Sequence, residues 1–522
     1  MAREQFDVCV IGGGINGAAV ARDAALRGLT VALVEAGDFG GATSSRSSKL
    51  IHGGFRYLPQ YHFKLVYEAL RERERLRHRT APHLVHPIRF LFPIYPGRGF
   101  GRIMMDVGLW MYDLFARTPW SERHRIISKE AAVRREPALA PGGMSGAALY
   151  YDAAADDARL TFENVLDAGM HDAAVANYVL VEGLAKDSGR IASARVWDVV
   201  NDERFEIHAR HFVNAAGPWV DDIRRMDDPA AQASVRLTKG VHLIFPLSAL
   251  PVNEPIVLTD EADRIIFVIP QDRYVLVGTT DTDFSGDRRN VAADEDDIRY
   301  LLKVLGDGLP KITLTADDVV SSFAGLRALI VDGNAGSPSS VPREETILES
   351  ASGMLTVAGG KLTTHREIAE KVINRLMKQL GRKAGRSPTR TEPLPGAREI
   401  ENPGNSVVPL GKSFRILQAR YGSRAAFVNA IVAEHPELGT PLAPDCPAIG
   451  AEVIHAIRNE MAQTVADFLV RRTALIWRYP LEAEAAAPAV ARIMANELGW
   501  DSEREDAELS GFVSDLKRRR AA

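Results

Sequence analysis

The chain has 522 residues, of which 46% are hydrophobic, and a formal net charge of -4 at pH 7. This length is enough for a large core divided among two to four domains. The near balance of acidic and basic residues does not favour nucleic-acid binding. Only two cysteines occur, Cys9 and Cys446, so we expect neither a disulfide framework nor a metal site.

The first motif lies close to the amino terminus. Residues 6–11 form an apolar run typical of a buried strand, residues 15–27 predict a helix that ends at Gly28, and residues 30–34 predict a second strand. Glycines in Gly-x-Gly-x-x-Gly spacing let a backbone approach a pyrophosphate at a helix start, and an acid after the second strand binds a ribose hydroxyl. The sequence therefore predicts dinucleotide binding by Gly12, Gly14, Asn16, Gly17 and Glu35.

The position of this motif also bears on location. It begins five residues after Met1, which leaves no space for a signal peptide, and no stretch reaches the ~20 consecutive apolar residues of a spanning helix. We expect a cytoplasmic protein whose contact with a membrane, if it has one, is peripheral.

Residues 38–54 are rich in Gly, Ser and Thr and predict a loop. Such a loop beside a glycine turn can surround phosphates with hydroxyls and amides. The predicted cofactor contacts in it are Thr43, Ser44, Ser45, Ser47 and Ser48.

Two segments distant in sequence are predicted to belong to the same nucleotide-binding unit. Residues 212–219 predict a strand that ends in a small-residue turn, and residues 354–380 predict a strand, a double-glycine turn and a helix. The free amides of that helix start would face a negative group. A single glycine unit with its domain in several pieces favours FAD over NAD. The further predicted cofactor contacts are Ala216, Gly217, Trp219, Gly360, Lys361, Leu362, Thr363 and Thr364.

The predicted fold class is α/β, with a split Rossmann-type FAD-binding domain, an inserted antiparallel-sheet substrate domain and a C-terminal helical domain. The FAD-binding domain takes residues 1–80, 151–235 and 345–381, and the substrate domain takes residues 81–150 and 236–344. Residues 382–411 are rich in Pro and Gly and predict a linker, followed by the helical domain at 412–522. A helix is expected over 452–471, and the charged tail 515–520 is expected to be frayed or solvated.

The segment 98–117 has apolar residues at helical spacing, including Trp110 and Met111, between Arg98, Arg102 and Arg117. It could dock on a membrane surface or pack against the substrate sheet.

Several short strings together resemble the flavin-dependent, respiratory (aerobic) glycerol-3-phosphate dehydrogenases. They run in the same order over residues 5 to about 375, and the likeness fades after 390. The strings are Ile11-Gly-Gly-Gly-Ile-Asn-Gly17, Ala42-Thr-Ser-Ser45, Ser47-Ser-Lys-Leu-Ile-His-Gly-Gly54, Arg56-Tyr57-Leu58, Ala216-Gly-Pro-Trp219, Lys239-Gly-Val-His242, Gly278-Thr-Thr-Asp281 and Gly359-Gly-Lys-Leu-Thr-Thr364. The resemblance implies FAD, oxidation of sn-glycerol 3-phosphate to dihydroxyacetone phosphate, electron transfer to quinone, and a membrane-associated homodimer.

A phosphate dianion needs several fixed donors, preferably guanidinium groups. The resemblance assigns substrate contact to Arg56, Tyr57, Arg327, Arg343, Lys361 and Thr363. Arg327 and Lys361 are also predicted to act in catalysis, and Lys361 could serve either the phosphate or the anionic reduced flavin. The proton of the substrate hydroxyl needs a base, for which His52 and His242 remain alternatives.

Three positions depart from the family pattern, namely His365 where Tyr is usual, Ala328 where Pro is frequent, and Glu344 beside Arg343. An amine-oxidising flavoenzyme of the D-amino-acid-oxidase-like group would share the split domain, but it needs a carboxylate clamp rather than this many cations. An oxygen-using glycerol-phosphate oxidase would share every substrate residue. A flavin-binding protein without activity is the third alternative.

Overall fold

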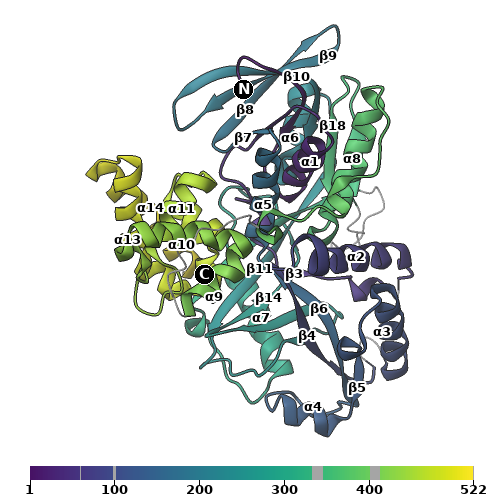
Figure 1. Cartoon of the computed structure of the whole chain (residues 1–522). Coiled ribbons are helices and arrows are strands. Elements are labelled where there is room, and N and C mark those ends of the chain that lie inside the picture. The colour runs from purple at the N-terminus through teal and green to yellow at the C-terminus, as the bar shows by residue number, and fades with distance from the viewer. Residues whose placement is uncertain (59, 98–100, 332–344, 400–411, 521–522) are drawn as a thin grey trace.

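The computed structural model describes residues 1–58, 60–97, 101–331, 345–399 and 412–520. Two β-sheets and a group of helices form the molecule, with the helices at the left of Figure 1 beside both sheets. The predicted fold class is confirmed. The linker residues 400–411, the segment 332–344 and Arg98 lie outside the described residues.

The first sheet carries the nucleotide-binding unit. Five parallel strands stand in the order β18-β10-β1-β2-β7, and antiparallel strands extend it at β18 and β10. Their bounds are β1 Gln5–Ile11, β2 Val31–Val34, β7 Ala174–Ala176, β8 Val179–Asp187, β9 Arg190–Asp198, β10 Glu203–Asn214, β17 Glu345–Glu349 and β18 Leu355–Gly359. The apolar run of β1 is buried on both sides, as the central strand of a parallel sheet must be.

One face of this sheet is covered by three helices, α1 (Ile15–Leu26), α5 (Asp157–Met170) and α8 (His365–Gln379). The alanines of α1 let α5 and α8 pack closely on either side of it. Helix α6 (Val220–Asp227) packs beside β8 and β18.

The second sheet is the antiparallel sheet predicted for the substrate domain. Its strands are β3 Leu50–Ile51, β4 Val85–Ile94, β5 Arg125–Ile127, β6 Gly146–Ala155, β11 Val235–Pro246, β12 Ile256–Thr259, β13 Ile265–Gln271, β14 Tyr274–Gly278, β15 Thr282–Asp283 and β16 Ser321–Ile330. Apart from the parallel bridge between β12 and β4, its pairs are antiparallel. Strand β11 pairs with β14 on one side and β16 on the other, which brings three distant segments to one place.

Helices surround the second sheet. Helices α4 (Lys129–Arg135) and α7 (Glu295–Gly308) border its lower part in Figure 1, while α2 (Phe63–Arg75) and α3 (Arg102–Ala116) pack together at the right. Within the described ranges, no helix combines the length and the apolar character needed to cross a bilayer.

The C-terminal helices are α9 Lys412–Tyr421, α10 Ala425–Glu434, α11 Gly450–Glu460, α12 Leu475–Arg478, α13 Pro480–Leu498 and α14 Ser502–Arg520. The helix expected over 452–471 is wrong, because α11 ends at Glu460 and Met461 adopts a left-handed conformation with φ 54°. The Asp467 carboxylate then accepts the amides of Gln463 and Thr464, which favours a turn there over a continuous helix.

For the tail at 515–520, expected to be frayed or solvated, fraying is wrong, although Lys517, Arg518 and Arg520 are exposed. These residues belong to α14, in which Phe512 and Leu516 form a buried pair at i, i+4 spacing among charged neighbours. The carbonyl of Arg519 accepts a hydrogen bond of 2.7 Å from the Ser322 hydroxyl on β16. The tail is therefore anchored on the substrate sheet.

The C-terminal domain also contacts the nucleotide-binding domain through buried charges. Asp38, after β2, pairs with Arg472 at 2.7 Å, and Arg159 on α5 pairs with Glu460 at 2.6 Å. Burial alone would raise the pKa of Asp38, but Arg472 and Arg471 hold it well below its usual range. In the described part of the predicted linker, Arg398 pairs with Asp167 of α5. Losing one partner of such a pair would leave a buried charge without compensation.

Candidate active site

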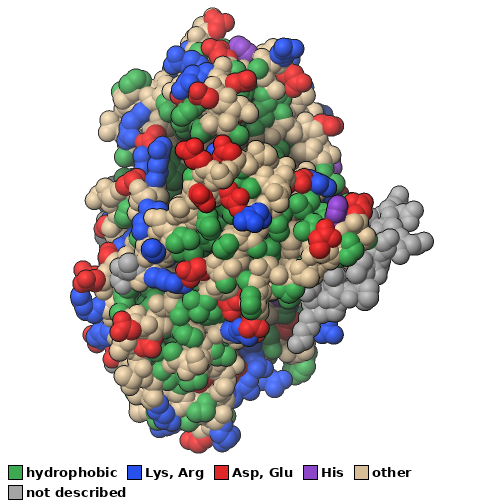
Figure 2. Space-filling model, turned by 90° about the vertical axis from the view of Figure 1, so that its left-hand side faces the viewer, with side chains coloured by type: hydrophobic (Ala, Val, Ile, Leu, Met, Phe, Trp, Pro, Cys, Tyr) green, Lys and Arg blue, Asp and Glu red, His purple; other side chains and the backbone are tan. Residues whose placement is uncertain are grey.

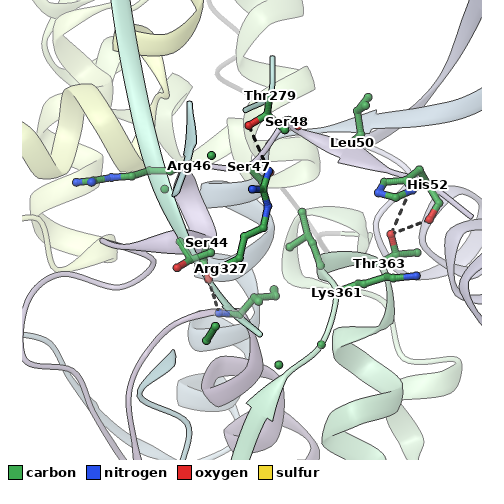
Figure 3. A pocket seen from close by; sticks show the side chains of 18 of the residues that line it. Ser44, Arg46, Ser47, Ser48, Leu50, His52, Thr279, Arg327, Lys361 and Thr363 are labelled. Atoms are coloured by element: carbon green, nitrogen blue, oxygen red, sulfur yellow. Dashed lines mark hydrogen bonds between the residues drawn. The ribbon is translucent and has the colours of Figure 1, made fainter. Parts of the chain in front are cut away.

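A cavity of about 330 Å³ lies between the two sheets. The glycine turn, the hydroxyl-rich loop, the ends of β10 and β18, and strands β11, β14 and β16 all contribute to its wall. Figure 3 shows the Arg327 side chain reaching past the loop toward Thr279, with His52, Thr363 and Lys361 at the right. Segments as far apart in sequence as Gly14 and Thr363 therefore share one cavity.

The glycine turn is built without space for side chains. A Cβ on Gly17 would lie 1.8 Å from the carbonyl oxygen of Gly12, and a Cβ on Gly12 would lie 2.7 Å from that of Ala215. Gly12 has φ +106°, a conformation that favours glycine. Gly14 caps α1 and faces the cavity. The turn thus presents backbone rather than side chains at the start of α1.

Two polar side chains complete this region. The carboxylate of Glu35 accepts the amides of Gly13 at 2.7 Å and Gly37 at 2.9 Å, and burial raises its pKa. Asn16 donates to the carbonyl of Gly359, while its buried Oδ1 has no hydrogen-bond partner among the described residues. An acceptor beside the turn and an unpaired amide oxygen fit a ligand with ribose hydroxyls.

The predicted hydroxyl contacts divide into two kinds. Thr43, Ser44, Ser47 and Ser48 line the cavity, whereas Ser45 is fully buried beneath the loop. Ser44 accepts the amide of Ile15 at the start of α1, where the helix has free donors. The structure thus brings four of the five to the cavity.

Other contacts of this loop are structural. The Ser47 hydroxyl donates to Asp157 at 2.7 Å, and Lys49 pairs with the same carboxylate. Thr43 donates to the carbonyl of Leu326, the residue before Arg327. The loop is therefore tied to the strand that carries the principal cation of the cavity.

The two other predicted cofactor segments approach from the first sheet. Gly217 lines the cavity together with Ala215 and Pro218, whereas the predicted contacts Ala216 and Trp219 do not line it. From the β18 turn, the lining residues are Gly360, Lys361, Leu362 and Thr363. Thr364 is buried, and its hydroxyl donates to the carbonyl of Lys361.

Arg327 is held across β11 by three oxygens. Its Nη1 donates to the carbonyl of Thr280 at 3.1 Å and pairs with Asp281 at 3.0 Å, and its Nη2 donates to the Thr279 hydroxyl at 3.2 Å. The guanidinium occupies the space above Gly240, where a Cβ would come within 2.5 Å of it. A glycine within a strand can mark such a close approach.

His242 lies beside Arg327 and is almost completely buried. Its Nε2 is 2.8 Å from the Ser48 hydroxyl, and its ring stacks on Phe323 with centroids 4.7 Å apart. Burial, reinforced by Arg327 and Lys49, lowers the pKa of His242 to about 3. The imidazole is therefore neutral near pH 7 and retains a lone pair.

The other histidine and Lys361 stand on the opposite wall. The Thr363 hydroxyl bonds both the amide and the carbonyl of His52, at 3.1 Å and 3.2 Å, and thereby fixes its backbone. The Lys361 ammonium lies over the ring of Tyr57, 4.1 Å from its centroid. Tyr57 is buried and does not itself line the cavity.

Two predicted phosphate ligands cannot be placed. Arg343 lies outside the described residues, as does Glu344, and only the backbone of Arg56 is described, in the short turn Phe55–Tyr57. Of the other departures, Ala328 lines the cavity, and His365 is buried with its Nδ1 2.7 Å from the carbonyl of Leu362.

Sequence reasoning missed several residues of this cavity. Asp152 accepts hydrogen bonds from Tyr112 at 2.6 Å and Arg73 at 2.7 Å beneath the Gly53 amide. Asp281 and the glycines that accommodate Arg327 and His242 were also not singled out as site residues. The one sequence signal available for these glycines was their position inside predicted strands.

The residues present fit FAD. A side-chain-free turn, an unpaired Asn16 oxygen and an acid at the end of β2 suit the nucleotide half of such a cofactor. The cavity continues toward the second sheet, where the β18 turn and strands β11, β14 and β16 form its wall. In the described ranges, no cluster of side chains could hold a metal ion.

Comparisons with known proteins agree with this geometry. Residues 7–366 match the family of FAD-dependent oxidoreductases, and residues 387–505 match the C-terminal domain of alpha-glycerophosphate oxidase. The second match begins within the predicted linker. The earlier expectation that likeness fades after 390 is therefore wrong, because the match extends to residue 505.

The chain is 34% identical to an aerobic glycerol-3-phosphate dehydrogenase of Staphylococcus aureus, over 99% of this chain and 95% of that protein. A relative with the same name from Staphylococcus haemolyticus is 33% identical, over 97% and 93%. The crystal structure of a Bacillus halodurans glycerol-3-phosphate dehydrogenase complexed with FAD superposes with a TM-score of 0.80 at 29% identity, covering 100% of this chain and 96% of that one. The chain belongs to the family of FAD-dependent aerobic glycerol-3-phosphate dehydrogenases.

Proposed function

We propose that this protein oxidises sn-glycerol 3-phosphate to dihydroxyacetone phosphate by hydride transfer to FAD. The observation that carries this proposal is a single cavity in which a dinucleotide cradle meets Arg327, Lys361 and two histidines. Family membership supports the same reaction. When bound, FAD supplies the hydride acceptor.

The cations of the cavity would bind the phosphate. Arg327 offers a planar fork whose orientation is set by Asp281 and Thr279, and Lys361 offers a point charge from the opposite wall. Sequence reasoning adds Arg56 and Arg343 to this set. Two fixed cations on facing walls would orient the carbinol carbon, so that its hydrogen points in one direction.

A neutral histidine would take the proton of the secondary hydroxyl. His242 is neutral and hydrogen-bonded to Ser48, so a proton could pass to Nε2 directly or through the serine oxygen. His52 is the alternative, since Thr363 fixes its backbone at the cavity edge. We favour His242 because its Nε2 is hydrogen-bonded to Ser48, which lines the cavity.

An anaerobic titration tests the reaction. We expect glycerol 3-phosphate to bleach the flavin of the purified protein, and glycerol or a D-amino acid to bleach it far more slowly at equal concentration. Bleaching by the amino acid alone would favour an amine-oxidising enzyme, and no bleaching by any of the three would favour a flavin-binding protein without activity. Reoxidation rates with a quinone analogue and with oxygen then separate a dehydrogenase from an oxidase.

We further propose that the electron acceptor is a membrane quinone and that α3 docks the protein on the lipid surface. One side of α3 is packed on the protein through Met105, Leu109 and Tyr112. The opposite side is apolar and exposed, with Ile103 81% and Leu114 73% accessible, together with Met104, Val107 and Trp110. These five residues do not pack on the substrate sheet, whereas Met111 and Phe115 of the same predicted stripe pack against the core.

The surroundings of this surface suit an anionic bilayer. The Arg123 guanidinium lies over the rings of Trp110 and Trp120, and Arg102 and Arg117 are exposed at the two ends of the helix. Aromatic and basic residues around an apolar stripe are typical of interfacial helices. On the face with the C-terminal helices, by contrast, acidic and basic side chains are interspersed (Figure 2).

Flotation with liposomes containing phosphatidylglycerol tests the docking proposal. We expect the wild type to float, and Trp110→Glu with Leu114→Glu to remain at the bottom with its flavin retained. Val200→Glu, which places the same charge at an exposed apolar position on the β9–β10 turn, is the control and should float. Equal flotation of all three would place the docking surface elsewhere. The homodimer implied by the resemblance stays a prediction that light scattering in detergent can test.

A further inference from the structure

A column of rings connects the cavity to the C-terminal domain. The His242 ring stacks on Phe323 at an interplanar angle of 14°, and the Phe323 ring packs on Trp477 with centroids 4.5 Å apart. The guanidinium of Arg519 lies over the far side of this assembly, 4.8 Å from the Trp477 ring. Phe323 and Trp477 are each only 1% exposed.

The column joins three parts of the chain. His242 on β11 is directly opposite Phe323 on β16, whereas Trp477 belongs to α12 and Arg519 to α14. The hydrogen bond from Ser322 to the Arg519 carbonyl anchors α14 beside this column. The C-terminal domain thus reaches a cavity residue through one intervening ring.

The other side of the His242 ring is bounded by backbone. His242 is opposite Gly278 on β14, and a Cβ on that glycine would come within 2.3 Å of the imidazole. The ring is therefore enclosed between Gly278 and Phe323. Of these two neighbours, only Phe323 has a side chain that can move, and its position depends on Trp477, which packs against it.

We propose that the C-terminal helical domain completes the active site, with Trp477 and Arg519 as positioning residues that hold Phe323, and through it the His242 ring, in contact with Ser48. This inference rests on His242 as the proton acceptor in the proposed function. It gives the C-terminal domain a role in the reaction besides its contribution to stability.

The charges around the column fit this arrangement. Lys49 lies 5.9 Å from the Phe323 ring and 5.8 Å from the Trp477 ring, and its charge is paired with Asp157. Arg327, on the cavity side, is paired with Asp281, and Arg519 is paired with Asp515. Each of these three cations therefore has a carboxylate partner, and burial remains the main cause of the low pKa of His242.

The test is anaerobic flavin reduction by glycerol 3-phosphate in the holoenzyme across a range of pH. We expect Trp477→Leu to lower the limiting reduction rate about tenfold and to shift its pH profile, with the substrate concentration at half-maximal rate little changed. Trp477→Phe, which keeps a ring behind Phe323, should restore most of the rate. Flavin content reports whether each variant is folded.

Tyr421→Leu is the matched control, because Tyr421 is an equally buried aromatic residue of the same domain that packs on Arg159 and His455 instead. It should leave the rate and the pH profile unchanged. If Trp477→Leu fails to retain flavin, Phe323→Leu removes the middle of the column and decides by the same criteria.

The outcomes separate this inference from the function on which it rests. If His242→Asn slows reduction but Trp477→Leu or Phe323→Leu behaves like Tyr421→Leu, the positioning role is wrong and the base assignment stands. If His242→Asn reduces its flavin at the wild-type rate, the base assignment is wrong, and the inference is overturned with it.

Discussion

The two walls of the cavity use glycine in different ways. On the nucleotide side, Gly12 and Gly17 bring backbone against backbone, so that a ligand meets amides at the start of α1. On the substrate side, Gly240 and Gly278 make space in a sheet for the side chains of Arg327 and His242. A side chain added on the first wall meets atoms that cannot move, whereas one added on the second wall displaces a functional group.

The largest effect is expected from Gly17→Val. Its Cβ would lie 1.8 Å from the Gly12 carbonyl oxygen, so α1 cannot keep its place against β1. We expect protein without bound flavin, measured as the absorbance ratio at 450 nm and 280 nm. Gly306→Ala, in open space on α7, is the control and should keep full flavin content.

Gly240→Ala should impair the substrate wall and leave flavin binding at the nucleotide wall intact. The added methyl group would come within 2.5 Å of the Arg327 guanidinium, which can move because it is the flexible end of a side chain. We expect full flavin content and a kcat/KM for glycerol 3-phosphate about a hundredfold lower, since a charge-assisted contact to the phosphate is displaced. Flavin loss with an unchanged kcat/KM per bound flavin would contradict the division between the walls.

A smaller effect is expected from Asp281→Asn. The variant keeps Arg327 but weakens the ion pair of 3.0 Å that orients it. We expect KM for glycerol 3-phosphate to rise about fivefold with kcat nearly unchanged, as for the loss of one net hydrogen bond. Asp283→Asn, at an exposed pair with Arg236, is the control. Equal KM values for both variants would show that Arg327 needs no orientation by Asp281.

The smallest effect concerns stability. Burial lowers the pKa of His242 to about 3 and that of His365 to about 4, below the ordinary 6.5. The unfolded chain therefore binds more protons than the folded one between these values, so stability falls as pH decreases below 6.5. The slope is about 1.4 kcal/mol per pH unit for each histidine at most. His365→Gln should reduce the slope of the urea-denaturation midpoint plotted against pH between pH 7 and pH 5. An unchanged slope would contradict the assignment of this pH dependence to His365.

The nucleotide wall was predictable because its elements are contiguous. The strand, glycine turn, helix and Glu35 follow one another within about thirty residues, and each has a local signal in the sequence. The antiparallel sheet was predicted for a similar reason, from short apolar strands with turns between β13 and β14. Local rules suffice where neighbours in sequence are neighbours in space.

The substrate wall was predictable only in part. Arg327, His242 and Lys361 were found through resemblance, but Asp281 and Gly240 have meaning only once β11 lies between β14 and β16. The tail of α14 was expected to be frayed or solvated because its composition is charged, but its anchoring depends on a strand about two hundred residues away. Pairings of this kind leave no periodic signal in a single sequence.

The most direct measurement compares flavin reduction by glycerol 3-phosphate and by glycerol in the wild type and in Arg327→Ala, under anaerobic conditions and per bound flavin. The account predicts that the substitution lowers the second-order reduction rate with glycerol 3-phosphate about a hundredfold and leaves that with glycerol unchanged, because only the first substrate carries the phosphate that Arg327 would bind. Equal losses with both substrates, or no loss with either, would contradict phosphate recognition at Arg327.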